Sequence, residues 1–368
     1  MALEARDTLK PRMAKLLDRA YEKAAAHERL SYDEGVALLV EGDTHVLAAL
    51  AHRRRMHLHP EPVVTYIVER NINYTNACIT YCRFCAFYRK PGDKEAYVLS
   101  HEQIGRKIEE LLEVGGIQIL LQGGHHPDLP LTWYEEMLRY IKERYRVNVH
   151  GFSAPEIEHI SKVEGLPVET VIRRLRESGL GTIPGAGGEM LVDRVRGIIA
   201  PLKTTTESWL DVHRTAHRLG MRTTATMMFG HAETLPERVE HLERVRQLQD
   251  ETAGFTAFIL WTFQPENTAM WRYPKLESHQ YLRTAAVSRL YLDNVRNLQA
   301  SWVTQGARVA EISLRCGVND MGSTMLEENV VSAAGTTYAL DGPGIERSIR
   351  MCGFEPKRRN VYYEEVLS

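Results

Sequence analysis

From Pro62 onward, the chain alternates short β-rich runs with amphipathic helical segments, and this alternation limits the folds it can adopt. Strands joined through helices lie parallel, because the helix carries the chain back to the starting edge of the sheet. Because polar residues cluster after most of the runs, the pattern predicts an α/β fold of the TIM type, a parallel (β/α)8 barrel that is complete or nearly so. An eighth run is expected around residues 317–323, after seven clear ones at 64–73, 117–122, 147–153, 180–185, 222–229, 255–261 and 297–303.

The segments on either side of the predicted barrel have helical patterns. We expect a helical N-terminal extension over residues 1–60, the barrel over 61–325, and a C-terminal helical closure packed on the barrel over 326–368. A Ser or Thr followed three residues later by Glu or Gln is typical of a capping box at a helix start. Such pairs predict helix starts at Ser31 with Glu34, Ser100 with Gln103, Thr132 with Glu135, and Thr204 with Glu207.

Composition restricts the partners of the chain. Its 46 Lys and Arg residues nearly balance its 48 Asp and Glu residues, so it lacks the basic field that attracts nucleic acid. The first residues are charged, and the apolar runs are far shorter than a membrane span. Only five cysteines are present, three of them clustered, which does not suit a disulfide framework. We therefore expect a cytoplasmic protein with neither a nucleic acid nor a membrane as partner.

The clustered cysteines, Cys78, Cys82 and Cys85, have the spacing C-x3-C-x2-C. Three thiolates can hold three irons of a [4Fe–4S] cluster and leave the fourth iron open to a small molecule. Structural zinc is the alternative, but it takes four protein ligands, and Cys316 and Cys352 are far away in sequence. Pure electron transfer is a second alternative, although ferredoxins ligate every iron with cysteine and need little protein. The spacing therefore favours a reactive cluster.

With Phe84 included, the motif reads C-x3-C-x-aromatic-C and resembles the signature of the radical S-adenosylmethionine (radical SAM) superfamily. The resemblance implies two cofactors, a [4Fe–4S] cluster and S-adenosylmethionine. It also implies an external one-electron reductant of the flavodoxin or ferredoxin type. In such enzymes the cofactors produce a 5′-deoxyadenosyl radical, while the protein binds, orients and shields the reactants.

The same resemblance suggests which residues contact S-adenosylmethionine. A glycine-rich strand end at Gln122, Gly123 and Gly124 resembles the segment that binds the methionine amino group through the backbone. Ser153 follows the next predicted strand, and Glu189 lies in a G-T-I-P-G-A-G-G-E segment similar to a ribose-binding pattern, with one extra residue before the glutamate. Capping of the following helix is the alternative role for Glu189.

Motifs across residues 30–368 narrow the resemblance to the radical SAM enzymes of the futalosine route to menaquinone and of deazaflavin assembly. Among them are C-R-F-C-A-F-Y-R, L-Q-G-G-H-H-P, F-Q-P-E-N-T and Q-A-S-W-V-T-Q-G. Most similar is the dehypoxanthine futalosine cyclase family, which implies a small nucleoside-like substrate and a new carbon–carbon bond between ribose and benzoate. Aminofutalosine synthases, which add the adenosyl radical to their substrate, and deazaflavin-precursor synthase subunits are the alternatives.

A cyclase of this kind needs a base near the arene and polar groups for the substrate. The fifth predicted strand ends in F-G-H-A-E-T, so His231 and Glu233 are candidates for the base. The polar residues that could bind the substrate are Arg89, His125, Asn319, Ser323 and Thr324. A surface ion pair is the alternative role for Arg89.

Overall fold

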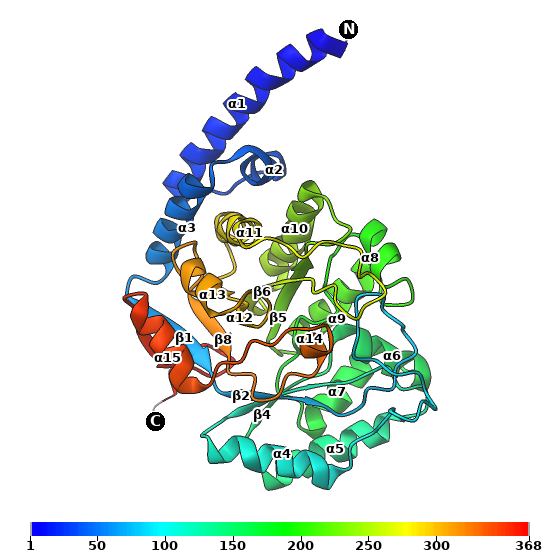
Figure 1. The fold of residues 1–368 in the computed structure, drawn as a ribbon. Helices are drawn as coiled ribbons and strands as arrows, with labels where there is room; N and C mark the ends of the chain where they lie inside the picture. Colours follow the sequence, from blue (N-terminus) through cyan, green and yellow to red (C-terminus); the bar gives the residue numbers. More distant parts are fainter. Residues whose placement is uncertain (1, 367–368) are drawn as a thin grey trace.

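The structure is a computed structural model that describes the backbone of residues 2–366 and the side chains of residues 13–366. Its centre is a parallel sheet wrapped by helices (Figure 1). The strands are β1 (Val63–Ile67), β2 (Glu69–Asn73), β3 (Gln118–Gln122), β4 (Asn148–Gly151), β5 (Thr223–Phe229), β6 (Phe255–Thr262), β7 (Asn297–Gln299), β8 (Asp320–Ser323) and β9 (Glu355–Arg358). Every one of the eight predicted runs contains strand or bridge residues.

Hydrogen-bonded pairing runs all the way around the barrel. β1 and β2 form one strand interrupted at Val68, with β1 paired to β8 and β2 paired to β3. The fourth predicted strand is reduced to two bridges, in which Thr182 pairs with His150 of β4 and Ile183 pairs with Thr223 of β5. The remaining neighbours are β3 with β4 and the series β5, β6, β7 and β8. The predicted eight-stranded barrel is therefore confirmed.

Helices cover the outside of the barrel and bury its apolar shell (Figure 1). They alternate with the strands, as a parallel barrel requires. The outer helices are α4 (His101–Glu113), α5 (Leu131–Arg144), α6 (Ala154–Glu164), α7 (Val168–Ser178), α8 (Asp193–Ile199), α9 (Thr206–Arg218), α10 (Leu235–Thr252), α11 (Ser278–Tyr291) and α13 (Ala307–Ser313). The short helix α12 (Trp302–Gln305) is wholly buried and lies on the inner side. In the part of the chain that the structure describes, none of the helices is both long enough and apolar enough to cross a membrane.

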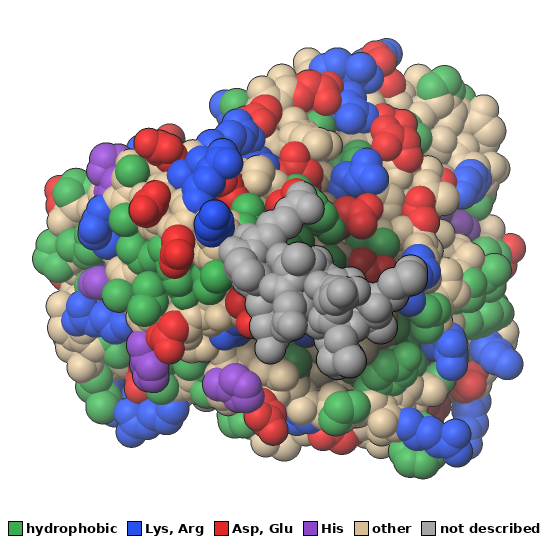
Figure 2. All heavy atoms as spheres, turned by 90° about the horizontal axis from the view of Figure 1, so that it is seen from above, with side chains coloured by type: hydrophobic (Ala, Val, Ile, Leu, Met, Phe, Trp, Pro, Cys, Tyr) green, Lys and Arg blue, Asp and Glu red, His purple; other side chains and the backbone are tan. Residues whose placement is uncertain are grey.

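Three helices precede the barrel: α1 (Ala2–Ala26), α2 (Tyr32–Glu41) and α3 (Thr44–Leu58). α2 and α3 pack on α10 and α11, while the first part of α1 extends away from the body (Figure 1). Glu34 of α2 ties α1 down through ion pairs to Arg19 and Lys23 at 2.9 and 2.8 Å. Figure 2, which views this end from above, shows acidic and basic side chains interspersed on the surface.

The chain after β8 contains α14 (Val330–Ala333) and α15 (Gly342–Met351), followed by β9. β9 pairs in parallel with β1, so the tail adds a strand as well as helices. Beyond β9, the Arg359 guanidinium forms a two-bonded ion pair with buried Asp320 of β8. Val361 and Tyr363 then line the inside of the barrel. The tail therefore contributes to the lumen of the barrel.

Two of the four predicted capping boxes are present, at Ser31 with Glu34 and at Ser100 with Gln103. The other two are wrong. α5 begins at Leu131 after Pro130, and the carboxylate of Glu135 pairs with Arg174 at 2.7 Å instead of capping the helix. α9 begins one residue later than predicted, because Thr205 accepts from the backbone N–H of Ser208. At Glu135 a tertiary ion pair competes with the predicted cap, and at Thr204 the neighbouring Thr205 hydroxyl takes its place.

Candidate active site

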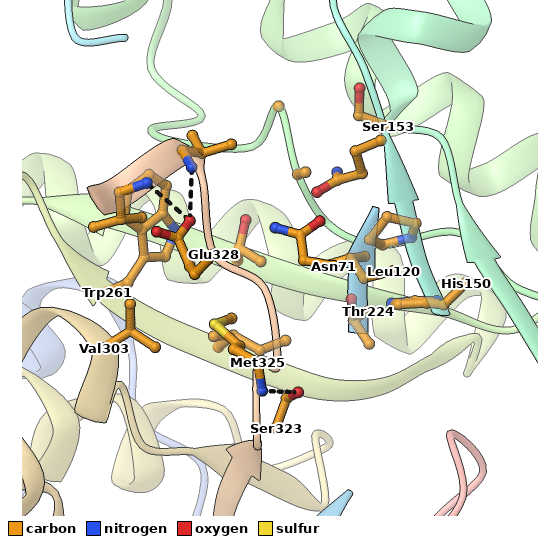
Figure 3. Close-up of a pocket in the computed structure, with 18 of the residues that line it drawn as sticks. Asn71, Leu120, His150, Ser153, Thr224, Trp261, Val303, Ser323, Met325 and Glu328 are labelled. Atoms are coloured by element: carbon orange, nitrogen blue, oxygen red, sulfur yellow. Dashed lines mark hydrogen bonds between the residues drawn. The ribbon is translucent and has the colours of Figure 1, made fainter. Parts of the chain in front are cut away.

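The barrel encloses a cavity of about 360 Å3 at the ends of its strands (Figure 3). Alternate residues of the strands line it, as the two-residue period of a strand requires. On β2 these are Glu69, Asn71 and Asn73, and on β3 they are Gln118, Leu120 and Gln122. The lining combines polar side chains with apolar ones such as Leu120 and Ile259, which is typical of small-molecule sites.

All three clustered cysteines line this cavity. The backbone N–H of Cys78 donates to the carbonyl of Arg89 at 2.9 Å, and the N–H of Arg89 donates to Asn76 O at 2.8 Å, which folds the loop back on itself. Burial raises the pKa of Cys82 to about 12 and also raises that of Cys85. Such thiols stay neutral unless a metal binds, because coordination deprotonates a thiol outright.

These cysteines do not form a single-ion site. Among the side chains of residues 13–366, no group of three or more His, Cys, Asp or Glu converges on one metal position. Three ligands that hold different irons of one cluster need not converge, whereas the ligands of structural zinc must. The arrangement therefore fits a cluster better than a zinc ion.

The glycine pair after β3 packs directly against the cysteine loop. A Cβ atom on Gly124 would lie 2.2 Å from Ala77 O and 2.9 Å from Cys78 Cβ. A Cβ atom on Gly123 would lie 2.5 Å from the ring of Tyr74. Both positions therefore require glycine for close approach. Gln122, at the end of β3, also lines the cavity.

A buried carboxylate joins this glycine pair to the next strand end. Oε1 of Glu156 accepts from the Gly123 N–H at 2.9 Å and from the Tyr74 hydroxyl at 2.7 Å. Oε2 accepts from the Ser153 N–H at 2.7 Å, and Ser153 caps α6 in return. Ser153 therefore lines the cavity while fixing Glu156. An S-x-x-E capping box was the available sequence signal for this contact.

Glu189 also lines the cavity, where it forms a buried ion pair with Lys203 at 2.8 Å. Burial opposes ionisation of Glu189, but Lys203 and Arg196 together hold its pKa below the usual value. The ammonium group of Lys203 also lies 5.3 Å from the centre of the Phe84 ring. The N-cap position of α8 is Val192, and no side chain caps the helix there, so Glu189 does not cap it. No motif in the sequence marks Lys203 as a cavity residue.

Two family models cover nearly all of the barrel and the tail. Residues 72–245 match the Radical SAM superfamily, and residues 252–367 match the CofH/MqnC C-terminal region. A cyclic dehypoxanthine futalosine synthase of Halalkalibacterium halodurans is 48% identical to this chain over 351 residues, covering 95% of each. The chain belongs to the radical SAM superfamily. It is an enzyme of this class, so the electron-carrier alternative is wrong.

Two further relatives and one solved structure are similar to this chain. A cyclic dehypoxanthine futalosine synthase of Streptomyces coelicolor is 43% identical, covering 94% of this chain and 88% of that one. An aminodeoxyfutalosine synthase of Thermus thermophilus is 39% identical, with 94% of each chain covered. The solved hydrogenase maturase HydG of Carboxydothermus hydrogenoformans has a TM-score of 0.75 at 16% identity, covering 98% of this chain and 84% of that one. That likeness supports the fold alone.

Radical SAM enzymes use a [4Fe–4S] cluster and S-adenosylmethionine, and the site fits both groups. The three free thiols face one cavity and have no disulfide partner among the described residues. Cys78, Cys82 and Cys85 would hold the cluster. The strand ends at Gln122–Gly124, Ser153 and Glu189, together with Phe84, border the same cavity and would hold S-adenosylmethionine.

The structure separates the expected substrate-binding residues into two groups. His125 and Ser323 line the cavity, whereas Arg89, Asn319 and Thr324 are not among its lining residues in the described chain. Arg89 pairs with Glu95 at 2.7 Å and donates to carbonyls of its own loop. The Oδ1 of Asn319 accepts from Arg289 at 2.6 Å. Thr324 donates to Glu69 O at 3.2 Å.

His231 and Glu233 lie close together at the end of β5, with both side chains fully buried. Glu233 accepts from Arg238 at 2.9 Å and from the N–H groups of Gly230 and His231, and His231 Nε2 lies 3.0 Å from Met228 O. Neither residue is among the described residues that line the cavity. Their polar atoms hold the loop after β5 together.

Proposed function

We propose that this enzyme is a cyclase that converts dehypoxanthine futalosine to cyclic dehypoxanthine futalosine in menaquinone biosynthesis. The observation that carries the proposal is the 48% identity, over 95% of both chains, to a relative of that name. The cavity supports it, because a lumen of about 360 Å3 with mixed polar and apolar walls suits a small nucleoside-like substrate.

Each part of the site has a role in this proposal. When bound, the cluster and S-adenosylmethionine would supply a 5′-deoxyadenosyl radical able to take a hydrogen atom from C4′ of the ribose. The apolar wall at Leu120 and Ile259 would hold the benzoate ring against the sugar, so that the carbon–carbon bond would form inside the barrel. The ring radical left by this addition would then lose a proton, and an electron to an external one-electron carrier, which restores the arene. Enclosure by the strands excludes water from the reacting atoms. An external one-electron reductant of flavodoxin or ferredoxin type completes the system.

The test is an anaerobic assay of the reconstituted enzyme with substrate deuterated at the ribose C4′. We expect cyclised product together with an equal amount of deuterated 5′-deoxyadenosine. Unlabelled 5′-deoxyadenosine beside cyclised product would contradict the abstraction site. A product that contains the adenosyl group, formed from the substrate of the aminodeoxyfutalosine synthases, would favour that activity instead.

A further inference from the structure

The lumen contains two polar side chains that each have a hydrogen-bonding group left free by the protein. Asn71 of β2 is 5% exposed and lines the cavity, and among the described side chains and backbone its Oδ1 has no hydrogen-bond partner. A buried amide without partners is costly, because it has lost its hydration and gained nothing in return. His150 of β4 also lines the cavity, with only one ring nitrogen used by the protein.

These two side chains lie at the same level of the barrel. Asn71 is in register with Leu120 of β3, and Leu120 is in register with His150. In-register residues of neighbouring strands point to the same side of the sheet, and all three line the cavity. Figure 3 shows Asn71 and His150 on either side of Leu120, with the Asn71 amide directed into the open space. The apolar side chain of Leu120 therefore has a polar side chain on each side of it.

The hydrogen bonds around His150 determine what it offers to a ligand. Its Nδ1 lies 2.8 Å from Thr182 Oγ1, and that oxygen already accepts from Asn148 at 3.3 Å. Thr182 is fully buried, and among the described residues its hydroxyl has no other acceptor, so the hydroxyl proton is donated to Nδ1 and the ring proton lies on Nε2. Burial, assisted by the charge of Arg359, lowers the pKa of His150 to about 3, so the ring is neutral.

The surroundings carry no spare positive charge for a carboxylate. Two cationic side chains line the described cavity, and both are paired: Lys203 with Glu189 and Arg359 with Asp320. An amide supplies one acceptor and two donors, and a neutral imidazole N–H supplies one more donor. Sugar hydroxyls both donate and accept without charge, so they match this set.

We propose that Asn71 and His150 form a hydroxyl-binding subsite for the ribose of the substrate, deep in the barrel lumen. The proposal rests on the proposed cyclase function and adds the groups that hold the sugar. Asn71 lies on the strand that leads into the cysteine loop, so a sugar bound there is held below the cluster site. Fixing the hydroxyls fixes which carbon of the ring faces that site.

The first test is Asn71→Ala in the reconstituted holoenzyme. We expect the substrate to bind about tenfold more weakly by equilibrium titration, with a raised KM, because a pair of hydrogen bonds is lost. Iron content and affinity for S-adenosylmethionine should stay at wild-type values. Gln264→Ala is the matched control, because Gln264 also has a buried Oε1 without a described partner but does not line the cavity. Wild-type substrate affinity in a folded, iron-loaded Asn71→Ala enzyme would overturn the subsite.

The second test uses deoxy substrates and does not depend on a variant folding. A substrate that lacks the contacted ribose hydroxyl should bind about tenfold more weakly to the wild type. That same analogue should bind equally to the wild type and to Asn71→Ala or His150→Phe. If every monodeoxy analogue binds the wild type as tightly as the full substrate, the subsite is refuted while the cyclase function stands. If the wild type does not bind dehypoxanthine futalosine at all, the proposed function fails and the subsite fails with it.

Discussion

The strand ends after β3 and β4 differ sharply from the strand end after β5, although all carry polar side chains. Glu156 holds Gly123 and still borders the cavity together with Ser153. Glu233 is satisfied by Arg238 and by the backbone N–H groups of Gly230 and His231, and the His231 ring is satisfied by Met228 O and the Ala232 N–H, outside the described cavity lining. A strand-end position is therefore not sufficient for a role in the reaction, because the polar atoms must also face the space where the ligand binds.

Among substitutions at residues that face the cavity, loss of a cluster ligand should have the largest effect on iron content and activity. In Cys82→Ala, two thiolates remain for a cluster that needs three, so the enzyme should lose its iron and its activity. The measurement is iron content and visible absorbance after anaerobic reconstitution. Cys316→Ala is the control, since Cys316 is buried among core residues elsewhere. Full iron content in Cys82→Ala would show that the ligand assignment is mistaken.

Gly124→Ala should have the next largest effect, because the added methyl group meets backbone rather than a movable side chain. Overpacking of this kind costs about 1–3 kcal/mol and shifts the neighbouring loop, here the one that carries Cys78. We expect a reduced iron content and a weaker affinity for S-adenosylmethionine. Gly197→Ala in α8 has open space around its Cβ and should instead raise stability by about 0.5–1 kcal/mol. Equal behaviour of the two variants would refute the packing argument.

Lys203→Met should lower stability, because it leaves the Glu189 carboxylate buried without its partner. Breaking a buried pair typically costs about 3–5 kcal/mol. Exposed pairs such as Arg173 with Glu169 contribute about 0–1 kcal/mol, so Arg173→Met is the control. Denaturant unfolding under identical conditions gives both values.

The pH dependence of the stability of Lys203→Met tests whether the unpaired Glu189 carboxylate causes the loss. In the wild type, the folded-state pKa of Glu189 is lowered, so its ion pair stabilises the protein above the unfolded-state pKa and is lost as the pH falls through the folded value. In the variant, burial dominates and reverses the sign, so acid relieves the penalty. The gap between variant and wild type should narrow as the pH falls from 7 towards 4. A gap that stays constant would point to lost packing instead.

The smallest effect on the reaction is expected for His231→Gln and Glu233→Gln. Because both residues are buried outside the described cavity lining, the ratio of 5′-deoxyadenosine to cyclised product should stay at the wild-type value. Stability should fall by about 1–3 kcal/mol in Glu233→Gln, since Arg238 loses its charged partner. Formation of 5′-deoxyadenosine without matching product would restore the sequence-based assignment of one of them as the base.

Acid titration sharpens this last prediction. Burial alone would raise the pKa of Glu233, but His231, Arg238 and two backbone N–H groups hold it below the usual value. The carboxylate therefore stabilises the fold at neutral pH, and that stabilisation is lost as the pH falls through the lowered pKa. Glu233→Gln should show a smaller loss of stability in acid than the wild type. Parallel stability–pH curves would contradict this assignment.

Local sequence patterns were sufficient for several parts of this enzyme. The βα alternation predicted the eight strands, and the cysteine spacing predicted the cluster loop, because both depend on near neighbours in the chain. Capping boxes were reliable only where nothing competed with the cap, as at Ser31 and Ser100. The strand-end rule placed Gln122, Ser153 and Glu189 at the cavity but could not separate them from Glu233.

Closure of the barrel decided the rest. It brings Lys203 to Glu189, inserts Arg359 from the tail beside Asp320, and points Asn71 into the lumen. These contacts join segments whose relative positions depend on which face of every strand turns inward, and a shift of one residue in register would turn each side chain to the opposite face. Sequence by itself determined the residue types and their local geometry. Only the tertiary structure decided which polar atoms are satisfied by the protein and which remain free for a ligand.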